Sequence, residues 1–484
     1  MASTTSSAMA DVTEVLLSPT FLVTAALLVA GNVIFFLSSY VRRPRHFPPG
    51  PPGLPGLGNL FQINKSIPAL TYTAWAHKYG QDKPMGVKLG ATNIVVLNSA
   101  RMVRDLFERR GAIYSDRPRP NGEDEKWKYQ THQVPAALFH DNGPWLTRWR
   151  REFNGALGSA AAVARLNPMN DAETARALVA LLEAGPTTSG PDLEEIILAW
   201  VTSVPCISVV GQRPDAMAHH GFDVKAFRSR TAGYMVLHKA SLMDRIPILR
   251  HLPGKFGMAA WRAESRVVAK GFPEVQQRIR EEVLQVSGGA PLKAADVPRL
   301  AYTEAFWHEG IPHAPAQDDE YDGFQIPKHT AVYANVWHIH HSPEDYASPE
   351  KFEPERFLRH PFGMRPGAAH DPTTMDASSS STAAANARAT FAFGFGRRVC
   401  PGMLLAKQSL ILGLAKVLWA FEVLPAEGGG ELDMDVETGF VQGLITFHPK
   451  KLDVSLRLRE GRSRQDILDH YAEAYQVEAE VMGW

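Results

Sequence analysis

The sequence predicts a mostly α-helical protein with a minor β part, preceded by one transmembrane helix. Three observations support this prediction: long stretches with helical periodicity, a few short β-rich runs, and one uncharged apolar segment near the start. The chain has 484 residues, enough for one large domain with appendages. Hydrophobic residues make up 45% and charged residues 21%, so the composition is that of a folded globular chain.

Net charge and cysteine content exclude several function classes. Lys plus Arg and Asp plus Glu both number 51, so the formal net charge is zero. A nucleic-acid-binding surface needs a basic excess, and we therefore expect no nucleic-acid partner. The two cysteines, Cys206 and Cys400, cannot form a disulfide framework or a four-cysteine zinc site. Cys206 lies in an apolar run and is interpreted as an inert core residue.

The uncharged apolar segment runs from Phe21 to Leu37, within an N-terminal segment of residues 1–40. With its neighbours it reaches the roughly 20 residues needed to cross the hydrocarbon core of a bilayer. Two acidic residues precede it and three arginines follow it, so the positive-inside rule places the N-terminus in the lumen and the remaining chain in the cytosol. The alternative is a cleaved signal peptide, but no positively charged region precedes the segment.

A hinge rich in proline and glycine, residues 41–60, predicts a semi-rigid spacer between the membrane helix and the body, residues 61–484. Two β-rich runs predict a hairpin within 84–98, and alternation predicts a strand over 326–339. Such a strand places His338 and His340 on one face. No carboxylate spacing completes a metal site there, so packing histidines are the preferred interpretation.

The rest of the body is predicted to be helical, with one interruption. Residues 368–390 are rich in Ala, Ser and Thr, which predicts an exposed, disordered insertion. A surface helix is expected from residue 457 onward. Apolar periodicity and capping signals predict further helices over residues 144–157, 171–184, 193–201, 273–286, 294–309 and 401–421.

A glycine-rich segment ending in a cysteine is the most informative part of the chain. Gly394 and Gly396 permit tight backbone bends. Cys400 stands directly before a predicted helix that begins at Pro401, and a helix N-terminus stabilises a thiolate and lowers its pKa. Gly402 has no side chain, so a flat group can approach. The segment therefore suits a sulfur anion held against a planar, electron-poor group, and haem iron with a cysteine ligand fits.

This segment resembles the haem-ligand loop of the cytochrome P450 family, F-[GS]-x-G-x-[RH]-x-C-x-G. Every fixed position of the pattern matches: Phe393, Gly394, Gly396, Arg398, Cys400 and Gly402. The resemblance implies that Cys400 is the axial ligand of the haem iron. It further implies that Phe393 packs beside the thiolate and that Arg398 pairs with a haem propionate.

The resemblance extends over most of the chain. The anchor and hinge are similar to those of microsomal members, and Tyr114 to Pro118 resembles the B-helix region. Arg150, within W-L-T-R-W-R, is the expected C-helix partner of a propionate, although the strict W-x-x-x-R spacing fails. Arg356, within P-E-R-F, is expected in a buried Glu–Arg–Arg network with Glu309.

The family's properties follow as expectations. They are a cytochrome P450 fold, haem b, and NADPH electrons delivered by a separate reductase. The protein is expected to be a monomer in the endoplasmic reticulum membrane, with one membrane pass and a cytosolic catalytic domain. It is expected to insert one oxygen atom into a lipophilic small molecule. The style of the sequence resembles fungal enzymes of secondary metabolism.

Two family motifs are missing. No arginine stands three residues after Glu309, so the E-x-x-R of the K-helix is incomplete. No threonine lies between Thr231 and Thr303, so the acid–threonine pair that relays protons during dioxygen activation is absent and no catalytic residue is assigned. The chain also leaves no room for the family's long central helix, which indicates lost segments. Two alternatives to a monooxygenase therefore remain: an impaired haem-binding relative, or an oxygen-independent isomerase of the same fold.

Overall fold

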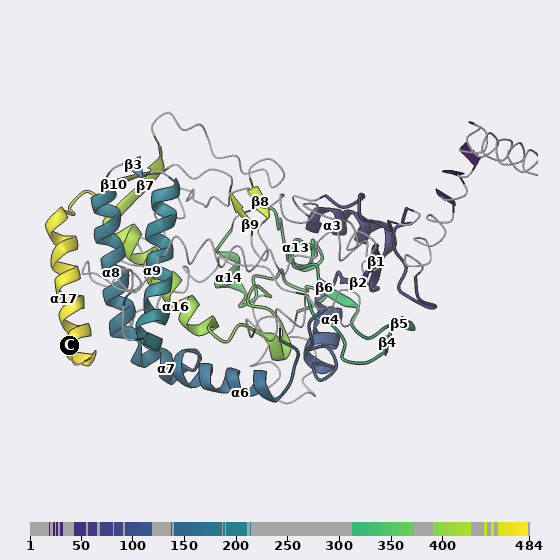
Figure 1. Ribbon diagram of the computed structural model, residues 1–484. Helices are drawn as coiled ribbons and strands as arrows, with labels where there is room; N and C mark the ends of the chain where they lie inside the picture. Colours follow the sequence, from purple (N-terminus) through teal and green to yellow (C-terminus); the bar gives the residue numbers. More distant parts are fainter. Residues whose placement is uncertain are drawn as a thin grey trace, which may run out of the picture.

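The computed structural model describes residues 43–118, 140–210, 312–371, 391–426 and 454–482 with short gaps, together with shorter pieces elsewhere (Figure 1). The described elements form a helical half and a β-rich half. The cysteine-bearing segment leads from the β-rich half into the helix α16, Met403–Ala420.

Four helices lie side by side in the helical half, on the left of Figure 1. Apolar side chains of α16, such as Leu412 and Trp419, are buried against Leu178 and its neighbours. A three-stranded antiparallel sheet in the order β3-β10-β7 covers one end of these helices. The elements are α8 (Asn167–Ala184), α9 (Gly190–Val210), α16, α17 (Arg464–Met482), β3 (Thr187–Thr188), β7 (Phe421–Pro425) and β10 (Val454–Leu458).

The β-rich half is built on the predicted hairpin, which is confirmed. Strands β1 (Met85–Leu89) and β2 (Thr92–Leu97) pair antiparallel with Met85 opposite Val96, and β6 (Ala331–Ala334) adds to β2 in parallel. The other elements here are α3 (Pro68–Tyr79), α4 (Ala100–Val103), β4 (Asp319–Tyr321), β5 (Phe324–Ile326), α13 (Val336–His340) and α14 (Arg356–Arg359). A further strand pair is β8 (Phe440–Gln442) with β9 (Phe447–Pro449).

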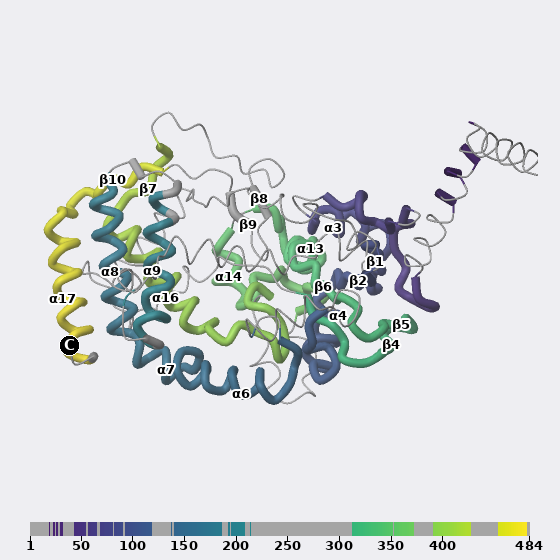
Figure 2. Tube along the Cα trace, viewed as in Figure 1, coloured from purple at the N-terminus to yellow at the C-terminus, as the bar shows by residue number. Residues whose placement is uncertain are grey.

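A run of consecutive helical segments along the lower edge of Figure 2 connects the two halves. It consists of α6 (Pro144–Phe153), the π-helical turn η2 (Asn154–Gly158) and α7 (Ala160–Arg165), and it leads into α8. The prediction of a helix over 144–157 is therefore confirmed. A second π-helical turn, η1 (Arg104–Arg109), follows α4 directly.

The proline-rich hinge is attached to the sheet along much of its length. The Gly86 amide of β1 donates to the Pro49 carbonyl at 2.8 Å, and Arg43 donates to the carbonyl of Gly50. The Asn59 side chain accepts from the Lys88 amide at 2.9 Å. The described residues of the hinge thus pack on the sheet that follows them.

The prediction of one strand over 326–339 is wrong. Strand β5 ends at Ile326 and strand β6 ends at Ala334. Asn335 then accepts a hydrogen bond from the His338 amide, and the helix α13 follows. On a helix, residues two apart do not share a face, so His338 and His340 are not the strand pair that alternation suggested. Burial and the nearby His77 and His341 lower the pKa of His338 to about 4, as expected for a neutral packing residue.

Other boundaries also differ from the predictions. Helix α9 is far longer than the predicted 193–201, and α16 begins two residues later than predicted. The chain at 457 lies in β10, which pairs with β7, before α17 begins. Residues 368–371, at the start of the predicted insertion, are described and include the buried Ala368 and Asp371.

Several predictions fall outside the described residues. These are most of the N-terminal segment, the predicted helices over 273–286 and 294–309, the rest of the insertion, and the region where the central helix was predicted to be lost. Within the described part of the chain, α16 is the helix whose length and apolarity are sufficient to cross a membrane. It packs against α8 and lies half-buried in the helical core.

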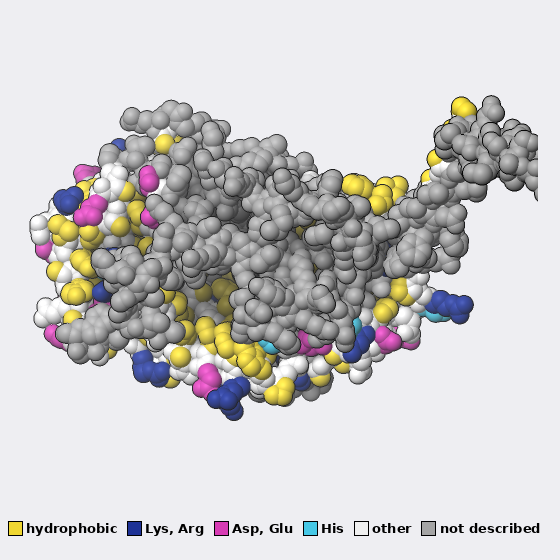
Figure 3. All heavy atoms as spheres, in the orientation of Figure 1, with side chains coloured by type: hydrophobic (Ala, Val, Ile, Leu, Met, Phe, Trp, Pro, Cys, Tyr) yellow, Lys and Arg dark blue, Asp and Glu magenta, His cyan; other side chains and the backbone are white. Residues whose placement is uncertain are grey.

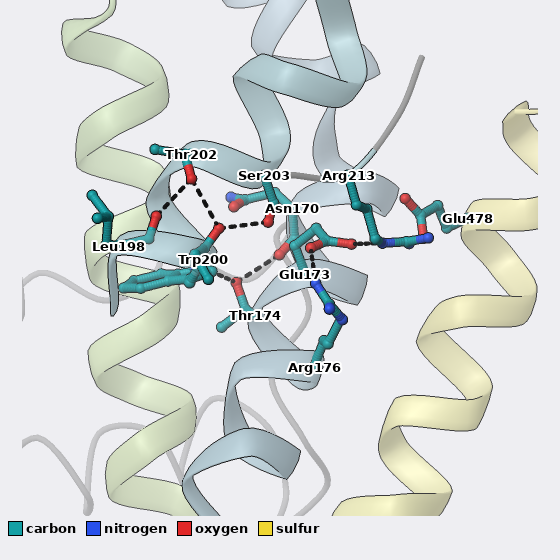
Figure 4. Close-up of polar contacts among 11 residues, drawn as sticks. Asn170, Glu173, Thr174, Arg176, Leu198, Trp200, Thr202, Ser203, Arg213 and Glu478 are labelled. Carbon is teal, nitrogen blue, oxygen red and sulfur yellow. Dashed lines mark hydrogen bonds and ion pairs between the residues drawn. The ribbon is translucent and has the colours of Figure 1, made fainter. Parts of the chain in front are cut away.

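A buried ion cluster attaches the C-terminal helix α17 to the bundle (Figure 4). Arg213 bridges two carboxylates, with its Nε 2.5 Å from Glu173 and its Nη2 2.6 Å from Glu478. Arg176 lies 3.5 Å from Glu173. Glu478 is fully buried, and its Oε1 has no hydrogen-bond partner among the described residues. Burial raises the pKa of Glu478 to about 7, although Arg213 opposes this shift.

This cluster predicts a pH-dependent stability. Because the pKa of Glu478 is raised from 4.5 to about 7, the folded state binds more protons across this window, and stability falls as pH rises through it. We expect the free energy of unfolding to fall by about 2 kcal/mol, after allowing for solvent screening. Urea denaturation at pH 5 and pH 8 measures the difference. Glu478→Gln removes the titration, and an equal pH dependence in that variant would contradict the assignment.

Candidate functional site

The cysteine loop, residues 393–402, is a tight turn closed by backbone hydrogen bonds. The Cys400 amide donates to the Phe393 carbonyl at 2.7 Å, and the Gly394 amide donates to the Phe391 carbonyl at 3.0 Å. Gly394 has φ +80° and Gly396 has φ +46°, values that L side chains rarely adopt. The sequence prediction of tight bends at both glycines is therefore confirmed.

The π-helical turn η1 fixes one side of this loop. A Cβ built on Gly396 would lie 1.9 Å from the carbonyl oxygen of Phe107 in η1. The ring of Phe107 packs against that of Phe395, with 5.2 Å between centroids. Phe395 is almost fully buried, whereas Phe393, the residue that the sequence motif emphasises, is half-buried.

The Cys400 thiol lies half-buried at the end of the loop. Helix α16 begins at Met403, capped by Gly402, so Cys400 lies three residues before the helix. Burial raises the pKa of Cys400, while a hydrogen bond from the Gly402 backbone and the charge of Arg150 lower it. Burial therefore outweighs the two effects that lower the pKa of Cys400.

Three arginines converge beside the loop. Arg398 is 7% exposed and donates to the His140 carbonyl, and Arg150 of α6 donates to the Val399 carbonyl next to Cys400. Arg117 is 4% exposed and donates to the Pro312 carbonyl at 2.7 Å. The sequence singled out Arg398 and Arg150, and the structure brings both to the loop.

These arginines crowd positive charge into a buried space. Burial and the neighbouring Arg398 and Arg150 lower the pKa of Arg117 well below its ordinary value. Burial and Arg150 lower the pKa of Arg398 to about 10, against a smaller opposing effect of Asp116. The Nε of Arg398 is buried without a hydrogen-bond partner among the described residues. Burying like charges is costly, so this arrangement favours a bound anionic group.

A neutral histidine and aromatic rings border the arginines. His313 is 2% exposed, its Nδ1 lies 2.8 Å from the Tyr114 carbonyl, and its ring is 4.2 Å from that of Phe107. Burial and Arg117 lower the pKa of His313 well below its ordinary value, so it adds no further charge. On the face seen in Figure 3, apolar side chains gather over the region between α6 and α16. Leu404, in the first turn of α16, is exposed.

Sequence reasoning missed the role of Arg117 in this cluster. Arg117 lies in the segment Tyr114–Pro118 that the resemblance covers, but nothing in its spacing indicates burial. Its position becomes clear when residues 114–118 pack against Pro312 and His313, almost 200 positions later. The signal that was available is a lone arginine between an acidic residue and a proline.

Arg356 holds its own loop together. Its guanidinium donates to four backbone carbonyls at 2.9 to 3.2 Å, those of Ala347, Ser348, Lys351 and Glu353. Glu353 also places a carboxylate oxygen 3.7 Å from it. Glu309, its expected partner in a Glu–Arg–Arg network, lies outside the described residues, so that network stays a prediction.

Comparison with known proteins identifies the class of this chain. The family model described as cytochrome P450 matches residues 48–269 and 272–455. These ranges include the cysteine loop and the three arginines beside it. The chain therefore belongs to the cytochrome P450 family.

Its relatives are fungal cytochrome P450 monooxygenases. The chain is 44% identical to the cytochrome P450 monooxygenase grgG of a Penicillium species, over 97% of this chain and 98% of the relative. It is 27% identical to the monooxygenase acuD of Aspergillus aculeatus and 26% identical to patI of Aspergillus clavatus, in both cases over 96% of this chain and 99% of the relative.

Proposed function

We propose that this protein is a membrane-anchored haem-thiolate monooxygenase that inserts one oxygen atom into a lipophilic small molecule of fungal secondary metabolism. The observation that carries the proposal is the cysteine loop, with Cys400 placed beside three arginines, of which Arg117 and Arg398 are buried. The named relatives, all cytochrome P450 monooxygenases, support the reaction class.

The residues of this site fit haem b. Cys400 supplies a thiolate ligand for the iron. The propionate carboxylates match the unpartnered Nε of Arg398 and the positive charge of Arg117 and Arg150. Phe393 lies in the same loop, whereas a Cβ built on Gly402 would face the ring of Phe153 in α6 at 3.7 Å. When bound, haem with a cysteine ligand supplies the electron-rich iron that favours O–O cleavage.

The surroundings of the site support the proposed partners. Arg148 and Arg151 of α6 are exposed, as is Arg397 of the loop, and these cations suit an acidic electron donor such as an NADPH-dependent reductase. The N-terminal segment suits single-pass anchoring in the endoplasmic reticulum membrane, with residues 41–60 as the hinge and 61–484 as the cytosolic catalytic domain. A membrane-tethered body favours lipophilic substrates.

A second candidate is a haem-binding relative with impaired oxygen chemistry, and two observations favour it. The alignment with grgG covers 567 positions, whereas 97% of the 484 residues is about 470, so about 100 positions of the relative have no counterpart here. The family match is interrupted at residues 270–271, directly before the predicted helix at Pro273. The first observation supports the loss of segments, and the second lies in the region where the sequence lacks the threonine of the acid–threonine pair.

Spectroscopy and oxygen uptake distinguish these candidates. In microsomes containing this chain and a reductase, we expect a thiolate-type spectrum of the reduced carbon-monoxide complex. NADPH-dependent oxygen uptake with substrate oxidation supports the monooxygenase. The same spectrum without oxygen uptake and without any change in the substrate supports the impaired relative. Rearrangement of the substrate without oxygen uptake supports an isomerase. Absence of any thiolate-type spectrum from a folded, haem-supplied protein would overturn all three. Sequencing the transcript tests directly whether segments are missing from the chain.

A further inference from the structure

The π-helical turn η2 contacts the backbone next to Cys400. Gly158 ends this turn, and a Cβ built on it would lie 2.3 Å from the carbonyl oxygen of Pro401 and 2.5 Å from Oδ1 of Asn154. Real Cβ atoms essentially never come this close to a backbone oxygen. The close approach of η2 to the cysteine loop therefore requires glycine at position 158.

The Pro401 carbonyl belongs to the same peptide group as the Gly402 amide. A peptide group is planar and trans, so its C=O and N–H point in opposite directions. The Gly402 backbone hydrogen-bonds the Cys400 sulfur. One end of this rigid group thus rests on Gly158 while the other end donates to the sulfur.

The run from α6 to η2 holds the peptide groups on both sides of the cysteine. Arg150 of α6 donates to the carbonyl of Val399, the residue before Cys400. Gly158 of η2 packs on the carbonyl of Pro401, the residue after it. π-helical turns are rare in proteins and often occur at functional sites.

We propose that Gly158 is a positioning residue that sets the orientation of the Gly402 N–H toward the sulfur of Cys400. The inference rests on the proposed haem-thiolate function. Hydrogen bonds to a ligating sulfur withdraw electron density from it and thereby raise the reduction potential of the bound iron. A side chain at position 158 displaces the Pro401 carbonyl, rotates the peptide group and weakens the N–H···S contact.

The test is the reduction potential of the haem-loaded Gly158→Ala variant. We expect the haem-loaded variant to have a more negative reduction potential than the unchanged protein. The potential is measured on protein that still gives the thiolate-type spectrum of the reduced carbon-monoxide complex. Gly155→Ala is the matched control, because Gly155 lies in the same turn and a Cβ there meets nothing within 4 Å. Equal potentials for the two variants would overturn the inference.

A double variant separates the two close contacts of Gly158. The double variant Asn154→Ala with Gly158→Ala removes the crowding by the exposed Asn154 side chain but leaves the contact with the Pro401 carbonyl. Because one clash is relieved, the double variant also folds more readily than Gly158→Ala alone. We expect the negative shift to persist, and a return to the original potential would assign the effect to Asn154 instead. If the unchanged protein lacks a thiolate-type spectrum, the proposed function fails. If that spectrum is present and the potentials do not differ, only the role of Gly158 fails.

Discussion

Replacing Cys400 by serine is expected to abolish the thiolate-type spectrum of the reduced carbon-monoxide complex. A serine hydroxyl is nearly isosteric but is not a thiolate, so it cannot give the electron-rich sulfur ligation that defines this spectrum. The loop itself is held by backbone hydrogen bonds, such as that from the Cys400 amide to Phe393, and these survive the substitution. We therefore expect a folded protein that has lost the spectrum completely.

Cys206→Ser is the matched control for this experiment. Cys206 lies half-buried in α9, and burial raises the pKa of its thiol, as expected for an inert core cysteine. We expect the control to keep the spectrum of the unchanged protein. If Cys400→Ser keeps that spectrum while Cys206→Ser loses it, the ligand has been assigned to the wrong cysteine.

Replacing Gly396 by alanine is expected to have the second largest effect. Alanine at φ +46° costs about 1–2 kcal/mol. The added methyl group also meets the Phe107 carbonyl at 1.9 Å, and that oxygen belongs to backbone that cannot rotate away. We expect the free energy of unfolding to fall by more than 3 kcal/mol in total, with loss of haem retention. Urea denaturation and the haem content of the purified protein measure these effects.

Gly367→Ala separates the two causes. Gly367 has φ +71°, but a Cβ built on it meets nothing within 4 Å. This variant therefore carries the backbone cost without the clash, and we expect it to retain haem and to lose only about 1–2 kcal/mol of stability. Similar losses in the two variants would show that the contact between Gly396 and η1 is unimportant.

Local sequence signals predicted the parts of the fold that depend on nearby residues. The hairpin of β1 and β2 follows from two β-rich runs separated by a turn, and α6 follows from a proline at the helix start. The bends at Gly394 and Gly396 follow from glycine's freedom at positive φ. In each case the relevant contacts lie within about a dozen residues of one another along the chain.

The remaining features depend on contacts between distant residues. Strand β6 ends where Asn335 caps α13, and apolar alternation does not reveal that change. Phe395 and Arg117 become buried because residues near 107 and 313 pack around them. The balance of effects on the Cys400 pKa likewise depends on burial, which spacing along the chain does not specify.

The attachment of the hinge has a practical consequence for anyone who wishes to produce a water-soluble form of this enzyme. A shortened gene that starts at residue 61 discards Phe47, whose side chain is buried, and the Pro49 carbonyl that accepts from Gly86. Such a product exposes the edge of β1, and unpaired strand edges promote aggregation. A start codon placed just before Arg43 removes the apolar leader and leaves that edge covered.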